Sequence, residues 1–404
     1  MFEQIQAPKA DPILSLISEY KNDPRTTKID LGIGVYRNAD GITPIMQAVA
    51  RAEQQLMTTE TTKAYQGLIG DERFNTAIQT LLLGGTSAMA RASTLQTPGA
   101  SGALRNLADL LAFARPKATV WISNPSYINH RPIMQRAGLA VQEYPYLNMV
   151  TKAVDETAML DQVAQLGPDD VLLLHGCCHN PSGADLSLDA WQRIGELAQQ
   201  NGFLPFVDIA YQGLGDGLDA DAHGLRLLAD AVPELMISTS CSKNFGLYRE
   251  RTGAAILVGN DLGQAQNGRA KMCELARGSY SMPPSHGAAI VSTILADDEL
   301  NSLWRAELDS MNLRINGLRS ALVDSFRTAS QGESYDYFGR HKGMFSLTGL
   351  SDAKIARLKA EYGIYIVGGG RVNIAGLKLN QVETLVAAVV AVDVDVAVDV
   401  AVNV

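Results

Sequence analysis

The chain of 404 residues has little of what marks nucleic-acid-binding, membrane or secreted proteins. It has 34 Lys and Arg against 43 Asp and Glu, a formal charge of −9. Nucleic acids and anionic membranes are bound by clustered Lys and Arg, so neither partner is expected. No stretch is long and apolar enough to span a bilayer, and the first residues lack the basic and apolar regions of a secretory signal. We therefore expect a cytoplasmic protein.

Cysteine is also scarce. Cys177 and Cys178 are adjacent, while Cys241 and Cys273 stand alone. This arrangement matches neither a disulfide framework nor a metal-ligand spacing, so we expect reduced thiols and no metal. The chain also has no GxGxxG or Walker sequence, and the GIG at 32–34 is too short to be a dinucleotide fingerprint. No repeat of fixed period is visible, which excludes solenoids and propellers.

What the chain does have is a globular composition, with 46% apolar residues. Short β-rich runs recur through its middle, and an amphipathic stretch at 188–200 separates two of them. The runs lie at residues 119–123, 171–175, 204–208, 235–240 and 254–258. Strands alternating with helices predict an α/β fold, with a mostly parallel sheet covered by helices on both faces. In such sheets ligands bind beyond the carboxyl ends of the strands.

The sequence pattern changes after about residue 300. A long charged helical stretch at 298–324 precedes the segments GMFSLTGL, IYIVGG and RVNIAG, which predict a smaller α+β domain. The low-complexity tail at 391–404 alternates apolar and polar residues but follows an apolar helical segment. Two predictions remain for this tail: an edge strand, or a frayed end of the chain.

Lys243 is the first candidate for chemistry, in the segment STSCSKNFG. A lysine after small hydroxyl residues suits an amine that forms a Schiff base with a phosphorylated carbonyl cofactor. A lone lysine is more often a solvated surface residue. Here Ser240 and Ser242 flank it as phosphate donors, and Arg251 offers bidentate geometry to a phosphate eight residues further on.

A second anion-binding candidate is TPGASGALR, where residues 99–102 open an apolar helical stretch. Backbone amides at a helix N-terminus favour a phosphate, although an ordinary N-cap explains the pattern as well. Asp208 follows a strand-like run directly, with Tyr211 three residues later. Its carboxylate is either a helix cap or the partner of a protonated pyridine nitrogen. Asn180, in HGCCHNPSG, can donate to the phenolic oxygen of the same cofactor.

Together these segments resemble the aspartate and aromatic amino-acid aminotransferases of class I, fold type I, over residues 12–391. The resemblance rests on IDLGIGVYRNADGITP, TTKAYQGL, TPGASGALR, SNPSYINH, LLHGCCHNPSGADL, DIAYQGLGDGL, SCSKNFGLYRERTGA, YSMPPSHGA and GGGRVNIAG. It implies pyridoxal 5'-phosphate as cofactor and a homodimer with sites shared between subunits. It also implies a small domain built from both chain ends. We expect the N-terminal arm and the start of that domain at 1–43, the large cofactor domain at 44–305, and the interdomain helix with the rest at 306–404.

The resemblance also implies roles for the residues around the cofactor. Lys243 carries the cofactor and acts as general base and acid in the half-reaction. Asp208 is the partner of the pyridine nitrogen, supported by His130 and His175 behind it. Asn180 and Tyr211 bond the phenolic oxygen, and Asp208 and Tyr211 count with Lys243 as catalytic. The phosphate is held by Ala100, Ser101, Ser240, Ser242, Arg251 and Tyr65, the last from the other subunit.

For the substrate, Arg371 matches the arginine that binds the α-carboxylate, and Arg277 matches one that the partner subunit contributes for a side-chain acid. Gly34 matches a position where the backbone approaches the substrate, which Asn180 and Tyr127 also contact. Tyr127 stands where the family usually has a tryptophan stacked on the cofactor ring. Ala100 replaces a usual glycine. The tyrosine leaves the preferred substrate side chain open.

We therefore predict a ping-pong transaminase that moves the amino group of an acidic or aromatic L-amino acid to 2-oxoglutarate or oxaloacetate. An enzyme specialised for aromatic amino acids, or for a sulfonated acid such as cysteate, is the alternative. More remote alternatives are a β-lyase or decarboxylase with the same cofactor, or a non-catalytic ligand sensor. The two arginines favour the transaminase because they hold both acid groups of a dicarboxylate.

Overall fold

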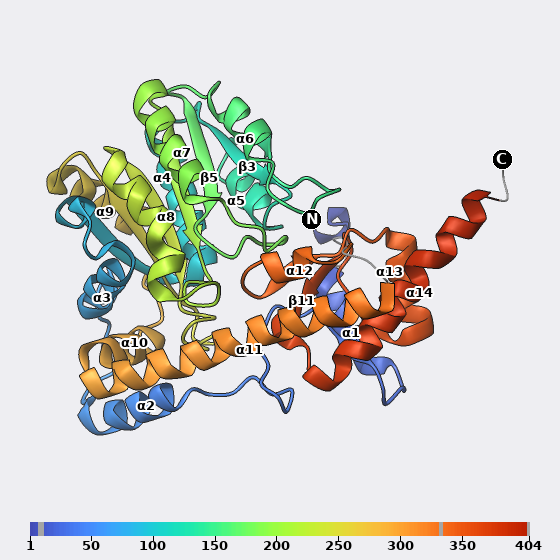
Figure 1. Cartoon of the computed structure of the whole chain (residues 1–404). Helices are drawn as coiled ribbons and strands as arrows, with labels where there is room; N and C mark the ends of the chain where they lie inside the picture. Colours follow the sequence, from blue (N-terminus) through green and yellow to red (C-terminus); the bar gives the residue numbers. More distant parts are fainter. Residues whose placement is uncertain (7–11, 331–333, 402–404) are drawn as a thin grey trace. The chain divides into compact units, whose positions relative to one another are not determined.

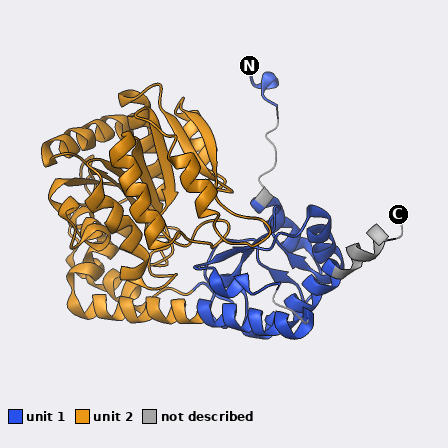
Figure 2. Ribbon diagram, turned by 45° about the horizontal axis from the view of Figure 1, so that its top comes forward, with its two compact units in different colours: residues 1–43, 315–404 blue, residues 44–314 orange. Residues whose placement is uncertain are grey.

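The computed structural model describes residues 1–6, 12–330 and 334–401. The chain divides into two compact units, shown in different colours in Figure 2. Unit 1 comprises residues 1–43 and 315–404, and unit 2 comprises residues 44–314. The second boundary falls inside helix α11 (Asp298–Ser330), nine residues beyond the 305/306 boundary expected from the sequence. Because this helix is continuous, no turn or proline marks the change of unit in the sequence.

Unit 2 is built on a seven-stranded sheet with the order β2-β8-β7-β6-β5-β3-β4. The five strands from β7 to β4 are parallel to one another, while β8 is antiparallel to both of its neighbours. This confirms the predicted mostly parallel sheet. The strands are β2 (Ala92–Pro98), β3 (Thr119–Asn124), β4 (Ala140–Pro145), β5 (Asp170–His175), β6 (Leu204–Ile209), β7 (Leu235–Ser240) and β8 (Thr252–Val258).

Helices cover both faces of this sheet (Figure 1). Residues of α4, α5 and α9 form one buried cluster with Leu173, Phe206 and Met236, and the alternate residues Leu172 and Leu174 point to the opposite face. On that face lie α7 and α8. The helices of unit 2 are α2 (Gln47–Thr59), α3 (Glu72–Leu83), α4 (Gly99–Ala114), α5 (His130–Arg136), α6 (Glu156–Val163), α7 (Leu188–Asn201), α8 (Leu218–Ala231), α9 (Leu262–Arg277), α10 (His286–Ala296) and the first part of α11.

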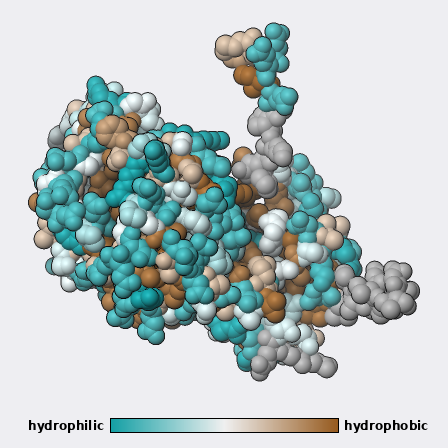
Figure 3. Space-filling view, turned by 90° about the horizontal axis from the view of Figure 1, so that it is seen from above, coloured by the Kyte–Doolittle hydropathy of each residue, from teal (hydrophilic) through white to brown (hydrophobic). Residues whose placement is uncertain are grey.

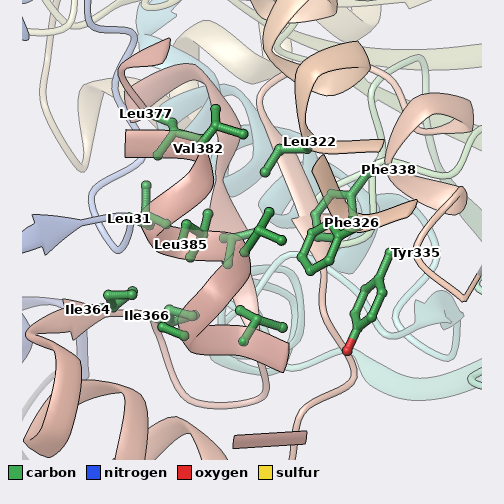
Figure 4. Packing of buried hydrophobic residues seen from close by; sticks show 14 of the residues in the cluster. Leu31, Leu322, Phe326, Tyr335, Phe338, Ile364, Ile366, Leu377, Val382 and Leu385 are labelled. Atoms are coloured by element: carbon green, nitrogen blue, oxygen red, sulfur yellow. The ribbon is translucent and has the colours of Figure 1, made fainter. Parts of the chain in front are cut away.

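Unit 1 combines helices with two small sheets. β1 (Ile29–Asp30) is parallel to β10 (Ile364–Tyr365), and β9 (Phe345–Leu347) is antiparallel to β11 (Arg371–Asn373). Its helices are α1 (Pro12–Asn22), the second part of α11, α12 (Tyr337–Arg340), α13 (Asp352–Tyr362) and α14 (Val382–Ala401). Figure 4 shows the core of this unit, where the Phe326 ring stacks on Tyr335 with the centroids 4.0 Å apart.

The edge strand considered for residues 391–404 is wrong, because α14 continues to Ala401. The helix begins with apolar residues at spacings of three and four, including Val382, Leu385, Val386 and Val389, which are buried in the core of unit 1. Packing of this face stabilises the helix, which then extends through the alternating segment at little cost per residue. The last three residues of the tail lie outside the described residues.

On the face seen in Figure 3 hydrophilic residues predominate, with hydrophobic residues scattered between them. Within the described ranges, no helix combines the length and the apolar character that crossing a membrane requires.

Candidate active site

Three neighbouring strands of unit 2 bring polar side chains together at their carboxyl ends. In the register of the sheet, His175 of β5 pairs with Asp208 of β6, and Asp208 pairs with Ser238 of β7. Paired residues of adjacent strands point to the same face, so these three side chains form one row. Strand β2 runs in the same direction as β7, since both are antiparallel to β8. Helix α4, which follows β2 directly, therefore begins at this same edge of the sheet.

A cavity of about 230 Å³ opens at this edge, entirely within unit 2. Every lining residue except Ala210 was named as a site residue from the sequence. The lining residues are Ala100, Ser101, Tyr127, His175, Asn180, Asp208, Ala210, Tyr211, Ser240, Ser242, Lys243 and Arg251. These residues come from six separate segments of the chain, and the fold brings their side chains together around one cavity.

Lys243 is half-buried in the loop between β7 and β8, three residues after Ser240. Its Nζ lies 5.0 Å from the centroid of the Tyr211 ring. The Tyr211 hydroxyl in turn accepts a hydrogen bond of 3.3 Å from Asn180 Nδ2. An amine, a phenol and an amide therefore converge on one wall of the cavity.

Asp208 is buried beside two donors. Its Oδ2 lies 3.0 Å from His130 Nε2, and its Oδ1 accepts a hydrogen bond of 2.5 Å from Ser238 Oγ. Burial by itself raises the pKa of Asp208. The hydrogen bond and charge of His130, together with the hydrogen bond from Ser238, lower the pKa by more than burial raises it, so the net pKa is below its ordinary value. Asp208 is therefore a buried carboxylate that stays ionised at neutral pH.

Two histidines lie behind this carboxylate. His130 Nδ1 is 2.9 Å from Ser126 Oγ, so both of its ring nitrogens have partners. The ring centroid of His175 lies 5.0 Å from that of His130, and neither His175 nitrogen has a hydrogen-bond partner among the described residues. Burial, and secondly the charge of His130, lower the pKa of His175 to about 3. His175 is thus neutral at physiological pH.

The low pKa of His175 predicts an acid-dependent loss of stability. In the unfolded chain this histidine takes up a proton below about pH 6.5, whereas in the folded chain it does so only near pH 3. Its contribution to the free energy of unfolding is therefore present above pH 6.5 and lost as the pH falls toward 3. We expect His175→Asn to flatten the decline in stability over this window, measured by urea unfolding at a series of pH values. The matched variant His223→Asn, which removes an exposed histidine, should keep the wild-type slope; equal slopes for all three proteins would contradict the assignment.

The opposite end of the cavity is built to hold a dianion. The first turn of α4 brings Ala100 and Ser101 to the cavity wall, where the backbone amides lack helical acceptors and the helix dipole is positive. Arg251 Nη1 donates to Ser242 Oγ at 3.3 Å. Gly99 has a φ of +66°, and a Cβ added there would lie 2.7 Å from Arg251 Nη2. A side chain at residue 99 would fill the cradle, so the glycine keeps it open for a phosphate.

Five predicted residues do not line this cavity, and one of them, His130, lies behind Asp208 as described above. Tyr65 follows α2 and is 91% exposed, and Arg277 is the exposed last residue of α9. Gly34 and Arg371 belong to unit 1, where Arg371 Nη2 donates to the Gly32 carbonyl oxygen at 2.8 Å.

Sequence reasoning missed several residues that support the site. Ser238 and Ser126 bond Asp208 and His130, and only the strand register reveals the first of these contacts. His179 is fully buried, with Nε2 3.0 Å from Ser123 Oγ and its ring stacked on Tyr146 at a centroid distance of 4.0 Å. The motif HGCCHNPSG, already singled out for Asn180, was the available signal for His179.

Cys177, Cys178 and Asp221 also come together, with donor atoms within 4.8 Å of one another, which their spacing in the sequence does not suggest. The Asp221 carboxylate accepts backbone N–H groups of Gly213, Gly215 and Asp216. We therefore assign this cluster to the structure of the loop after β6.

Fold and cavity together are those expected of an enzyme that binds a phosphorylated cofactor beyond the carboxyl ends of its strands. Residues 26–389 match the family model described as aminotransferase class I and II, and the chain belongs to this family. It is 45% identical to the aromatic-amino-acid aminotransferase of Paracoccus denitrificans, over 96% of this chain and 98% of that protein. It is 43% identical to the aspartate aminotransferase of Escherichia coli strain K12, over 97% of this chain and 100% of that protein.

A solved structure of a relative identifies the cofactor. The aromatic-amino-acid aminotransferase of Burkholderia pseudomallei, described as covalently bound to pyridoxal phosphate, is 37% identical. It matches with a TM-score of 0.94 over 97% of this chain and 99% of that chain. The enzyme is accordingly a pyridoxal-phosphate-dependent aminotransferase. Its cavity fits the group, because an amine, an ionised carboxylate and a phosphate cradle surround one space.

Proposed function

We propose that this aminotransferase moves the amino group of an acidic or aromatic L-amino acid to 2-oxoglutarate or oxaloacetate. The observation that carries the proposal is the single cavity that holds Lys243, the ionised Asp208, the Asn180–Tyr211 pair and the phosphate cradle. The names of the relatives, aromatic-amino-acid and aspartate aminotransferase, support both classes of donor.

Each wall of the cavity has a defined part in holding the cofactor. The backbone amides of Ala100 and Ser101, and the side chains of Ser240, Ser242 and Arg251, bind the phosphate. Asn180 and Tyr211 would donate to the phenolic oxygen. Asp208 would pair with the pyridine nitrogen and favour its protonated form. When bound, pyridoxal phosphate supplies an electron sink for the electrons of the substrate Cα–H bond.

Lys243 performs the proton transfer. Its Nζ would hold the cofactor in covalent linkage. Once released, the same amine would act as the base that takes the proton from the substrate Cα and as the acid that returns it. The Tyr211 ring, 5.0 Å from Nζ, limits where this amine can move.

Tyr127 lines the cavity and would lie against the cofactor ring, where the family usually has a tryptophan. Its ring meets the edge of His130 at a centroid distance of 5.3 Å, and its hydroxyl accepts a hydrogen bond of 2.9 Å from Asn129 Nδ2. These contacts hold the smaller ring in one orientation, as a stacking partner must be held.

Two arginines bind the acid groups of the substrate. Arg371 holds the α-carboxylate near the backbone of Gly34, and Arg277 of a second subunit holds the side-chain carboxylate. The enzyme acts as a homodimer, and the 91% exposure of Tyr65 supports a role in which this tyrosine reaches the phosphate of the partner. The four free, buried cysteines suit a reducing compartment, so we place the enzyme in the cytoplasm.

Specialisation for aromatic donors is the second candidate, favoured by the 45% identity to an aromatic-amino-acid aminotransferase. An aromatic ring requires Arg277 to move aside, whereas aspartate or cysteate pairs with it directly. The charge of Arg277 therefore separates the two classes of donor.

Arg277→Ala tests the proposed function and its substrate class together. We expect kcat/KM for aspartate, glutamate and cysteate to fall by about 10²-fold or more, because a charged hydrogen-bonded pair is lost. The values for phenylalanine and tyrosine should change by less than about threefold, since this pair does not form with a ring. Steady-state rates with 2-oxoglutarate as acceptor measure both, with the intact 2-oxo acid as product.

Arg269→Ala, on the same helix α9, is the matched control and should leave all donors unchanged. An equal loss for every donor would remove the specificity role of Arg277. Release of carbon dioxide, or of a β-substituent from the substrate, in place of an intact 2-oxo acid would instead identify a decarboxylase or a β-lyase.

A further inference from the structure

We propose that Asn373 is a positioning residue for substrate binding, which clamps the turn at Ile33–Val35 and so orients Arg371 and Gly34. The inference rests on the proposed role of Arg371 as the carboxylate-binding arginine. All residues of the clamp belong to unit 1.

The side-chain amide of Asn373 binds both ends of the turn at residues 33–35. The Val35 N–H donates to the Ile33 carbonyl oxygen at 3.0 Å and closes a three-residue turn centred on Gly34. Asn373 Nδ2 donates to both Ile33 O, at 2.6 Å, and Val35 O, at 2.7 Å. Asn373 is only 1% exposed, so water does not replace these bonds. The amide thus ties the two ends of the turn to strand β11.

Arg371 lies two residues before Asn373 on this strand and holds the same segment. Residues two apart on a strand point to the same face, which lets both side chains reach residues 32–35. Arg371 Nη2 donates to Gly32 O at 2.8 Å, and the Asn373 N–H donates to Leu31 O at 2.9 Å. The orientation of the Arg371 guanidinium therefore depends on where the backbone of residues 31–35 lies.

The Phe345 ring links the turn to the arginine. The Arg371 guanidinium lies over this ring, 4.5 Å from its centroid, as a cation–π contact. A Cβ added at Gly34 would lie 3.0 Å from Phe345 Cζ and would push the ring by a few tenths of an ångström, so the glycine lets the turn approach the ring without displacing it. Phe345 pairs with Asn373 in the β9–β11 ladder. The turn, the ring and the guanidinium thus form one packed unit with Asn373 as its hydrogen-bonding anchor.

The chemistry of the anchor explains why it is an amide. Two carbonyl oxygens require a group with two N–H bonds and no charge, which asparagine supplies. An aspartate would place an anionic oxygen against both carbonyls, and an alanine would leave both without a partner. A bidentate arginine–carboxylate pair tolerates little displacement. Because the α-carboxylate is held equally in the bound substrate and in the transition state, a loosened turn raises KM more than it lowers kcat.

The test compares Asn373→Ala with the wild-type holoenzyme. We expect KM for the amino donor to rise about tenfold or more, with kcat changed by less than about threefold. The dissociation constant of succinate, a dicarboxylate probe measured by calorimetry, should rise by a similar factor. The absorbance of the bound cofactor should not change, because its site lies within unit 2. Asn373→Ser keeps one donor, so its KM and its dissociation constant for succinate should lie between those of the wild type and of Asn373→Ala. This variant provides a second measurement if the alanine variant folds poorly.

Ser346→Ala is the matched control, a buried polar residue of the same small sheet that contacts Arg319 and His341 instead of the turn. It should lower Tm and leave KM and succinate binding unchanged. A lower Tm with wild-type KM and succinate affinity in both Asn373 variants would overturn the proposal. Because succinate binding needs no turnover, a wild-type protein that binds succinate but does not transaminate would refute the proposed function and still test the clamp.

Discussion

Lys243→Ala is expected to lower kcat by at least about 10⁴-fold, because the substitution removes both the covalent anchor of the cofactor and its proton carrier. The purified variant should also lack the absorbance that a Schiff base between lysine and cofactor produces, whereas the wild-type protein should be yellow. Addition of aspartate or glutamate should convert the wild-type absorbance fully to that of the aminated cofactor, a conversion that the variant should not complete. Absorbance spectra and single-turnover rates measure the two effects.

Lys271→Ala is a suitable control, since Lys271 lies on α9 and pairs with Glu274 on the surface. It should keep wild-type colour and activity. A colourless Lys243→Ala protein with full activity would refute the assignment of this lysine, and with it the reading of the cavity as the active site.

Asp208→Ala is expected to lower kcat by about 10³-fold, because the variant loses the buried charge that stabilises the protonated pyridine nitrogen. The hydrogen bonds from His130 and Ser238 would also lose their acceptor. Rapid-mixing kinetics of the first half-reaction isolate this step, since they follow the cofactor absorbance after a single addition of amino acid.

Ser238→Ala distinguishes the charge of Asp208 from the hydrogen bonds around it. The variant loses the 2.5 Å hydrogen bond that Ser238 Oγ donates to Asp208 Oδ1 but keeps the charge, so kcat should fall by less than about tenfold. If Ser238→Ala and Asp208→Ala lose activity equally, the hydrogen-bond network and not the charge of Asp208 is what matters.

Local patterns in the sequence were enough for much of the fold. The runs at 204–208 and 235–240 correspond to β6 (Leu204–Ile209) and β7 (Leu235–Ser240), because buried parallel strands are short, continuous apolar segments. The amphipathic stretch at 188–200 corresponds to α7 (Leu188–Asn201), whose N-cap Ser187 accepts a hydrogen bond from the Ala190 N–H. In each case the signal lies within the segment itself.

Strand β2 shows why other elements were missed. Its segment ASTLQTP is fully buried up to its last residue yet mostly polar, so no apolar run marks it. Gln96 is satisfied by residues far away in the sequence, since Oε1 accepts from the Asp71 N–H and Nε2 donates to Pro284 O. Thr94 donates likewise to Gln79. A polar strand can be buried only when such partners exist, and they become visible only in the folded chain.

The sequence by itself predicted the chemistry of this protein. Lys243, Asp208, Asn180 and Arg251 lie at or near strand ends, and although none was decisive alone, their order along the chain and the resemblance to one family carried the prediction. The tertiary structure alone decided how these groups are supported. Ser238 bonds Asp208 across 30 residues, and Asn373 clamps the turn at Gly34 across about 340. Such contacts depend on strand order, register and burial, which arise from long-range packing and leave no pattern in the segments that they join.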